Sequence, residues 1–312
     1  MSKKAVVLLN MGGPSNLDEV PLFLSNMFND ENILGIKPTL LRKFVANMIV
    51  KRRKKIAQEN YSKIGGKSPL KDLTDSLIDR LRLKEPSLHF EYAMRYVPPF
   101  ARSCIGNLKR DGVEEVVLFS MYPHYSKTTS KSSIDDFIQA CKAANYSPSF
   151  KVVDRYFDHL GYNLAIISRI KEALGSKDES EFTLLISAHG LPQKVVDKGD
   201  PYQKEIKENI KVLEELLVKE GINFKNIDLA YQSKVGPLKW LEPSLDDALK
   251  KYKNKKVLIY PISFTIDNSE TIYELHKEYK EIAEQIGVEE FLVSACLNDK
   301  EEFAEAILEL SN

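Results

Sequence analysis

Two strand ends in the second half of the chain carry side chains that could bind a metal ion and move protons. His189 follows the apolar run Phe182–Ile186, and Glu270 follows the apolar run Val257–Tyr260. In open α/β sheets, ligands bind beyond the carboxyl ends of the strands. An imidazole and a carboxylate together suit a first-row divalent cation such as Fe(II), and an imidazole also titrates near neutral pH. We therefore predict a metal-binding and proton-accepting pair at His189 and Glu270.

Glu270 also begins a ladder of carboxylates at Glu270, Glu274 and Glu278. On a helix, the i, i+4, i+8 spacing places all three on one face, one turn apart. Most ladders of this kind are solvated faces with partners such as Lys277 and Lys280. Because Glu270 follows a strand end directly, the alternative is a row of carboxylates that passes a metal ion or protons inward.

Other common site types lack their signatures. The turn Gly12-Gly13-Pro14 fits neither GxGxxG nor GxxxxGK[ST], which argues against a nucleotide site. No GxSxG motif surrounds a serine near His189, so acyl transfer has no support. Three widely spaced cysteines without a CxxC motif argue against a zinc finger and against an iron–sulfur cluster held by this chain alone.

Composition adds further limits on function and location. The chain has 312 residues and equal numbers of basic and acidic residues, 45 each, so no bulk charge favours nucleic acid. The first apolar run is too short for a signal peptide, and no stretch approaches the roughly 20 apolar residues of a membrane span. We therefore expect a cytoplasmic protein. The basic run Lys51–Lys55 is either a solvated helix end or a contact for anionic lipid or propionate groups.

The elements that must position these residues follow an alternating pattern. Eight short apolar runs are separated by longer amphipathic stretches, at Ala5–Leu9, Phe90–Met94, Val116–Phe119, Phe150–Val153, Phe182–Ile186, Ile227–Ala230, Val257–Tyr260 and Phe291–Val293. Runs of this kind are typical of parallel strands buried on both faces, joined by crossover helices. The pattern predicts two similar α/β domains, residues 1–148 and 149–297, each with a mainly parallel four-stranded sheet flanked by helices. A C-terminal helix, residues 298–312, is expected to pack on the first domain.

The predicted strand ends of both halves gather aromatic residues, two histidines, a methionine, an arginine and an acidic cluster. This inventory suits a large, flat, partly apolar ligand together with a cation. Apolar residues between Leu22 and Leu34 could either form a lip that meets a lipid bilayer or belong to the core.

These motifs together resemble the ferrochelatase family. The matching segments run in family order and are LLNMGGP (Leu8–Pro14), NYSKIGGKSPL (Asn60–Leu70), AMRY (Ala93–Tyr96), YPHYS (Tyr122–Ser126), SAHGLP (Ser187–Pro192), GDPY (Gly199–Tyr202), YQSKVGPLKWLEP (Tyr231–Pro243) and FTIDNSET (Phe264–Thr271). The resemblance implies two Rossmann-like domains with a porphyrin cleft between or beside them. It also implies insertion of Fe(II) into protoporphyrin IX as the last step of haem synthesis, with release of two protons.

The resemblance assigns roles to residues of this chain. It carries the catalytic histidine onto His189 and the site glutamate onto Glu270. It places Met11 over one porphyrin face, with Arg95 and Tyr96 nearby. The remaining candidates belong to the porphyrin wall or a proton network, and they are Ser233, Trp240 and Asp267, with Lys63 and Ser126 as further candidates.

Three departures from the family pattern matter. Asn268 stands where the family often has histidine, which removes one titratable group from a proton relay. Val97 stands where glycine is common. No cysteine-bearing extension follows the last motif, so no iron–sulfur cluster is expected. Met11 resembles the protoporphyrin-using branch rather than the branch that uses coproporphyrin.

The resulting hypothesis gives His189 the role of general base for the pyrrole protons. Glu270 and Asp267 would hold protons or metal on the same side, and Glu274 and Glu278 would relay one or the other. Fe(II) is then a substrate met by His189, Glu270, Glu274 and Glu278, and no permanently bound cofactor is expected. The partners are protoporphyrin IX and Fe(II), and we expect a monomer.

Three alternatives stay open at this point. The first is a chelatase that places cobalt or another metal in a different tetrapyrrole. The second is a non-catalytic carrier of haem or metal, and the third is a structural α/β protein without a ligand.

Overall fold

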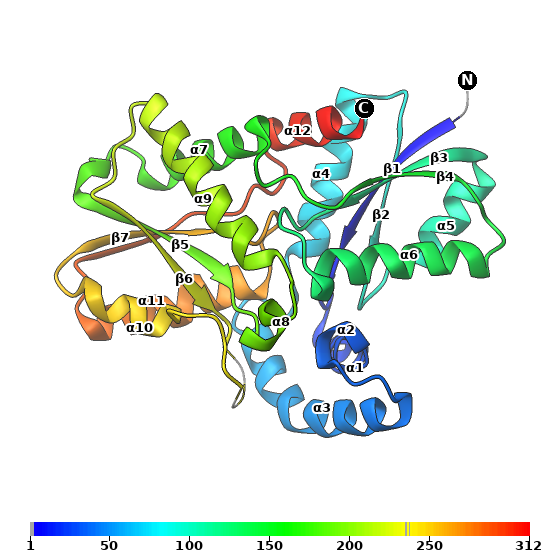
Figure 1. Cartoon of the computed structure of the whole chain (residues 1–312), viewed down its shortest axis with the longest axis horizontal. Helices are drawn as coiled ribbons and strands as arrows, with labels where there is room; N and C mark the ends of the chain where they lie inside the picture. The colour runs from blue at the N-terminus through cyan, green and yellow to red at the C-terminus, as the bar shows by residue number, and fades with distance from the viewer. Residues whose placement is uncertain (1–2, 235, 237) are drawn as a thin grey trace. The chain divides into compact units, whose positions relative to one another are not determined.

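The computed structural model describes residues 3–234, 236 and 238–312 (Figure 1). The chain divides into two compact units. The first unit comprises Met1–Arg155 and Ile307–Asn312, and the second comprises Tyr156–Ala306. Each unit contains one four-stranded sheet in which all strand pairs are parallel.

The sheet of the first unit has the strand order β2-β1-β3-β4. Its strands are β1 (Lys3–Asn10), β2 (His89–Met94), β3 (Val113–Ser120) and β4 (Ser149–Val153). A long crossover joins β1 to β2 and contains a short 3-10 helix (Leu17–Glu19) and four α-helices, α1 (Val20–Phe28), α2 (Glu31–Leu34), α3 (Thr39–Ser62) and α4 (Leu70–Lys84). The later crossovers contain α5 (Ala101–Arg110), a π-helical turn (Lys127–Lys131) and α6 (Ser132–Ala143).

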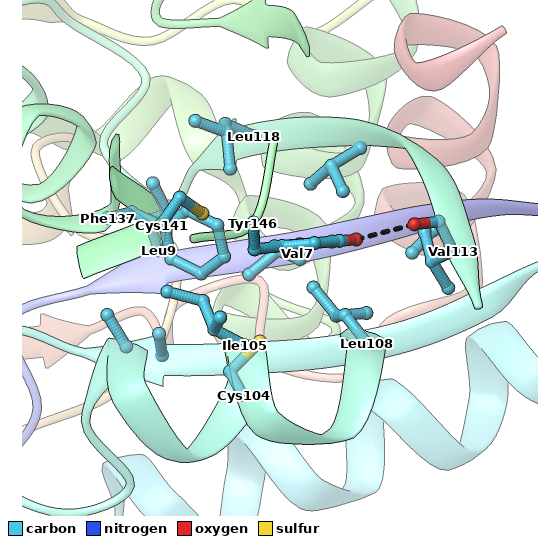
Figure 2. Close-up of a cluster of buried hydrophobic side chains, with 14 of the residues drawn as sticks. Val7, Leu9, Cys104, Ile105, Leu108, Val113, Leu118, Phe137, Cys141 and Tyr146 are labelled. Carbon is cyan, nitrogen blue, oxygen red and sulfur yellow. Dashed lines mark hydrogen bonds between the residues drawn. The ribbon is translucent and has the colours of Figure 1, made fainter. Parts of the chain in front are cut away.

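The central strand β1 is buried on both faces. Val7 and Leu9 pack with α5 and α6 around Ile105 and Phe137 (Figure 2). Because side chains alternate along a strand, the equally buried Leu8 points to the opposite face. This double burial explains why β1 is a continuous apolar run and not an alternating one.

The second unit repeats this order as β6-β5-β7-β8. Its strands are β5 (Phe182–His189), β6 (Asn226–Gln232), β7 (Lys256–Pro261) and β8 (Glu290–Val293). Its helices are α7 (Leu160–Leu174), α8 (Gln193–Asp197), α9 (Tyr202–Lys219), α10 (Leu245–Leu249), a π-helix (Glu270–Glu278) and α11 (Tyr279–Ile286). Figure 1 shows α7 and α9 on one side of this sheet and α10 and α11 on the other.

The predicted fold class is confirmed, because all eight apolar runs form strands of two parallel four-stranded sheets flanked by helices. The last helix, α12 (Glu301–Ser311), runs from the second unit into the first, and Lys4 Nζ on β1 donates to the Ser311 carbonyl at 2.8 Å. Across the described ranges, every helix is too short or too polar to cross a membrane.

Candidate active site

His189 and Glu270 are in direct contact in the second unit. Nδ1 of His189, at the end of β5, lies 2.6 Å from Oε2 of Glu270, at the start of the π-helix. The two side chains are 32% and 20% exposed, so the pair reaches the surface without being fully solvated. A charge-assisted hydrogen bond of this length fixes the orientation of the imidazole and directs its Nε2 away from Glu270.

Ser233 joins the pair to a second carboxylate. Its Oγ lies 3.0 Å from Oε2 of Glu270 and 2.6 Å from Oε2 of Glu274. Ser233 adopts a left-handed backbone with φ of 64°, which is uncommon for a residue other than glycine and costs free energy. This backbone follows the end of β6 directly, where it turns the hydroxyl toward the two glutamates.

The protonation states of this cluster follow from burial and from the close carboxylates. Burial raises the pKa of Glu274 to about 8, and the charge of Glu270 adds to this shift. Burial alone would lower the pKa of His189, but the charge and hydrogen bond of Glu270, with the charge of Glu274, outweigh it and raise that pKa above 6.5. Near neutral pH, Glu274 therefore carries a proton, and the shift at His189 favours the cationic form of its imidazole.

Gln232, to which no sequence pattern assigned a role, holds both glutamates against the sheet. This residue is buried, and its Nε2 donates to the Glu270 carbonyl at 3.1 Å and to Glu274 Oε2 at 3.2 Å. Its Oε1 accepts a hydrogen bond from Ser187 Oγ at 2.8 Å. The side chain therefore links β5 and β6 to the first turn of the π-helix.

Tyr202 and Ser263 fix the backbone of His189. The Tyr202 hydroxyl lies 2.9 Å from the His189 carbonyl and 2.6 Å from Ser263 Oγ. The His189 N–H donates to the same Ser263 Oγ at 3.1 Å. The GDPY motif contains Tyr202 and was a signal for this role, whereas nothing in the sequence singled out Ser263.

The segment that contains the carboxylate ladder is a π-helix and not the regular α-helix that the i, i+4, i+8 spacing predicted. Such helices form i→i+5 hydrogen bonds and occur frequently at functional sites. Glu270 and Glu274 both reach Ser233, while Glu278 is exposed at the end of this helix.

Asp267 and Asn268 anchor the start of this π-helix. The buried Asp267 carboxylate accepts hydrogen bonds from Thr271 Oγ1 at 2.8 Å, Asn298 Nδ2 at 2.7 Å and the Cys296 N–H at 3.3 Å. Oδ1 of Asn268 accepts the Glu270 N–H at 2.8 Å. The residue that replaces the expected histidine therefore caps the π-helix and holds the backbone of Glu270.

Two aromatic residues lie beside His189. Phe264 packs edge-on against the imidazole, with centroids 6.2 Å apart. Trp240 is half-buried and pairs with Pro192, and its ring would lie 3.3 Å from a Cβ atom added at Gly190. Such an atom would also come within 2.8 Å of the Gln232 carbonyl, which explains the glycine in SAHGLP.

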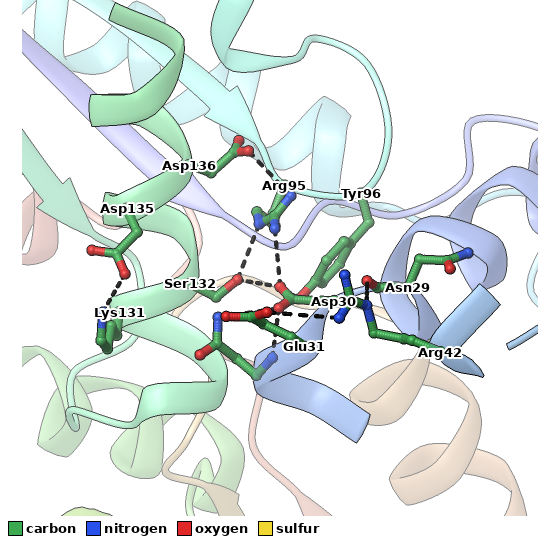
Figure 3. Close-up of polar contacts among 11 residues, drawn as sticks. Asn29, Asp30, Glu31, Arg42, Arg95, Tyr96, Lys131, Ser132, Asp135 and Asp136 are labelled. Atoms are coloured by element: carbon green, nitrogen blue, oxygen red, sulfur yellow. Dashed lines mark hydrogen bonds and ion pairs between the residues drawn. The ribbon is translucent and has the colours of Figure 1, made fainter. Parts of the chain in front are cut away.

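The first unit holds the remaining predicted residues. Met11 is partly exposed after β1, whereas Tyr96 is buried and its hydroxyl donates to Asp30 at 3.0 Å. Arg95 pairs with Asp30 and Asp136 (Figure 3). The structure thus turns the side chains of Arg95 and Tyr96 toward carboxylates of their own unit.

Two further candidates of this unit lie at helix ends. Ser126 is buried, and its Oγ accepts the Thr128 N–H at the start of the π-helical turn. Lys63 is exposed at the end of α3. Among all the residues that the structure describes, no three His, Cys, Asp or Glu side chains are arranged to hold a metal ion.

Comparison with known proteins gives matches along the whole chain. The ferrochelatase family model matches residues 3–312. A ferrochelatase of Wolinella succinogenes is 54% identical over 308 residues, which cover 99% of this chain and 98% of that protein. A ferrochelatase of Helicobacter pylori strain J99 is 46% identical over 309 residues, which cover 99% of this chain and 92% of that protein.

Solved structures agree in fold at low identity. SirB from Bacillus subtilis with Fe3+ superposes with a TM-score of 0.58 at 11% identity, covering 98% of this chain and 93% of that one. The sirohydrochlorin chelatase SirB of the same species with cobalt superposes with a TM-score of 0.58 at 10% identity, covering 99% of this chain and 94% of that one. These likenesses concern the fold alone, whereas the sequence matches extend over the motifs that supply His189, Ser233 and Glu270. The chain belongs to the ferrochelatase family.

Proposed function

We propose that this protein is a metal chelatase that inserts Fe(II) into protoporphyrin IX, releases two protons and yields protohaem. The observation that carries the proposal is the 2.6 Å contact between His189 Nδ1 and Glu270 Oε2 in a chain that matches the ferrochelatase family over residues 3–312. The pair combines a group that exchanges protons near neutral pH with an anionic group suited to a divalent cation.

Metal insertion exchanges two pyrrole protons for one Fe(II) ion, so the site must accept protons while it tolerates a cation. Glu270 holds His189 by Nδ1, which leaves Nε2 as the atom that exchanges protons with the substrate. An approaching cation disfavours the imidazolium form, so His189 loses its proton and becomes a base as the metal arrives. Nε2 then accepts each pyrrole proton in turn, and Nδ1 passes a proton to Glu270. The protonated Glu274, linked to Glu270 by Ser233, releases its own proton outward along the π-helix, which has the exposed Glu278 at its outer end.

Each unit, taken by itself, offers side chains that suit a porphyrin. Met11 offers a soft, partly exposed side chain to one face of the ring. Trp240 and Ser233 would line the site on the His189 side. Asp267 fixes the start of the π-helix, and Arg95 and Tyr96 fix the segment that is bonded to Asn10 and Met11. Ser126 caps the π-helical turn Lys127–Lys131.

A metallation assay tests the proposal. Purified protein mixed with protoporphyrin IX and Fe(II) under anaerobic conditions, or with Zn(II) as a surrogate, should give the absorbance of the metalloporphyrin. His189→Ala should abolish the reaction. His89→Ala, a partly exposed histidine of the first unit, should react normally. Porphyrin binding without metallation would point to a carrier, and insertion of cobalt only into another tetrapyrrole would point to a different chelatase.

We further propose that α3 contacts an anionic membrane surface. In the described structure, Phe23 and Phe28 of the apolar segment 22–34 are buried and Leu22 is 41% exposed, whereas a longer series of exposed apolar side chains lies on α3. Leu40 is 85% exposed and Phe44 is 68% exposed. The basic run Lys51–Lys55 follows on the same helix, and apolar and basic side chains together are typical of helices that lie on anionic bilayers.

A further inference from the structure

We propose that Asp30 is a positioning residue for porphyrin binding, which acts by holding the Met11 loop through Tyr96. The inference rests on the proposed function, because it assigns Met11 to the porphyrin site. Asp30 belongs to none of the matched motifs and lies between α1 and α2, in the crossover from β1 to β2.

The Asp30 carboxylate is buried at 4% exposure and is surrounded by donors. Oδ2 accepts hydrogen bonds from the Tyr96 hydroxyl at 3.0 Å, from Arg95 Nη2 at 3.1 Å and from the Ser132 hydroxyl (Figure 3). Oδ1 accepts the N–H of Asn32 at 2.8 Å. A buried charge is costly unless its partners compensate it, so the geometry of these donors is tightly determined.

The residues that Asp30 holds are bonded to the Met11 loop. The Tyr96 N–H donates to the Met11 carbonyl at 3.0 Å, and the Arg95 N–H donates to the Asn10 carbonyl at 2.8 Å. Asn26 Nδ2, from α1, donates to the Tyr96 carbonyl at 2.9 Å. Residues 95 and 96 are therefore held between Asp30 on one side and the backbone of Met11 on the other.

The loop itself leaves little room for adjustment. Gly12 has a left-handed backbone with φ of 80°, and a Cβ atom there would come within 2.5 Å of the Val97 side chain and 2.8 Å of Met94 Cβ. A shift of residues 94–97 would therefore displace the Met11 loop. This contact transmits the position of Tyr96 to Met11.

The segment around Asp30, residues 29–36, also positions the start of α3. Arg42 donates through Nε to the Asn29 carbonyl at 2.8 Å and through Nη1 to the Ile36 carbonyl at 2.7 Å. Asp30 follows Asn29 directly, so the buried Asp30 carboxylate connects the segment before α3 with the end of β2. A buried ion pair is weak evidence for stability, whereas a network that joins separate segments fixes their geometry.

A second carboxylate–tyrosine bond, on strand β2 just before residues 95 and 96, provides the matched control. Asp75 of α4 accepts the Tyr92 hydroxyl at 2.6 Å and pairs with Lys71. Its side chain is 44% exposed, and Tyr92 lies four residues before Tyr96. Asp75→Asn therefore removes the same kind of charge and hydrogen bond from β2 without touching the residues bonded to Met11.

The test compares Asp30→Asn with Asp75→Asn and the wild type. In the metallation assay, Asp30→Asn should raise the KM for protoporphyrin about tenfold, equivalent to about 1.4 kcal/mol. Its KM for Zn(II) and its kcat should stay within about twofold, since that range is under about 0.5 kcal/mol. Quenching of protein fluorescence by protoporphyrin should show the same loss of affinity, and Asp75→Asn should match the wild type.

Unchanged porphyrin affinity in folded Asp30→Asn would overturn the proposal, and so would equal rises in the KM values for porphyrin and Zn(II). If Asp30→Asn does not fold, Ser132→Ala removes one donor to the same carboxylate and should weaken porphyrin binding in the same direction. The binding measurement does not depend on metallation. A wild-type protein that binds protoporphyrin without metallating it would refute the proposed function, while the affinity of Asp30→Asn would still decide the role of Asp30.

Discussion

The carboxylates of Glu270 and Glu274 converge on a single hydroxyl group, with Ser233 Oγ 3.0 Å from one and 2.6 Å from the other. One hydroxyl supplies only one proton, so two ionised carboxylates there would leave one of them facing a lone pair. Protonation of Glu274 removes this conflict. The raised pKa of Glu274 is therefore what allows both carboxyl groups to share the Ser233 hydroxyl.

Stability should respond to the protonation of Glu274. The pKa of this carboxyl is about 8 in the folded chain against an ordinary 4.5, so folding retains a proton between these values, and stability falls as pH rises through that window. Glu274→Gln lacks this titration. Its Tm relative to the wild type should increase from about pH 5 to about pH 8 and then level off, as measured by scanning calorimetry. The exposed Glu278→Gln variant should follow the wild type, and a Tm difference independent of pH would contradict the assignment.

The pKa of His189 should depend on Glu270. In Glu270→Gln, the carboxylate that outweighs burial is gone, so the pKa of the imidazole should fall below that of the wild type. NMR titration of the imidazole protons measures this shift directly. The same variant should lose about 100-fold or more in kcat/KM, a typical contribution of general acid–base catalysis. An unshifted His189 pKa would show that the 2.6 Å contact does not control the base.

The carboxylate ladder should affect the metal more than the porphyrin. Glu274→Ala should raise the KM for Zn(II) while the KM for protoporphyrin stays constant, since Glu274 contacts the Ser233–Glu270 cluster. Glu278→Ala should have a smaller effect because that side chain is exposed. An unchanged metal KM in the variant that combines Glu274→Ala with Glu278→Ala would exclude a role of the ladder in metal delivery.

Gln232 should support activity through the geometry of the two glutamates. Gln232→Leu leaves Ser187 Oγ and the Glu270 carbonyl without this partner, at a cost of about 1–3 kcal/mol for each buried group. We expect a lower Tm together with a loss in kcat that exceeds any change in porphyrin KM. Gln203→Leu removes a 3.3 Å bond to the Tyr231 hydroxyl and serves as the control. Equal kcat values for the two variants would argue against a positioning role.

Binding to vesicles should depend on α3. The protein should co-sediment with vesicles that contain phosphatidylglycerol and not with pure phosphatidylcholine, and binding should weaken as salt rises. Leu40→Ser with Phe44→Ser should abolish it. Leu83→Ser on α4 changes a leucine that is 83% exposed and should bind normally. Binding of the α3 variant at the wild-type level would refute the membrane contact.

The strands and the central pair could be predicted from the sequence because both rest on local patterns. Buried parallel strands require continuous apolar runs, and the end of such a run locates His189. The contacts of Asp30 and Gln232 could not be predicted, since each depends on partners far along the chain, such as Tyr96 for Asp30. The π-helix was missed because a spacing of four residues keeps Glu270 and Glu274 adjacent in both helix types.

The identical strand order of the two sheets has a consequence for engineering. In each sheet, the second strand in spatial order is the first along the chain, β1 in one unit and β5 in the other. The thioether of Met11 follows β1, and the imidazole of His189 ends β5. The equivalent strand end therefore carries an uncharged thioether in the first unit and a proton-exchanging imidazole in the second. A side chain introduced at the end of β1 can therefore be compared, within one chain, with the imidazole already present at the end of β5.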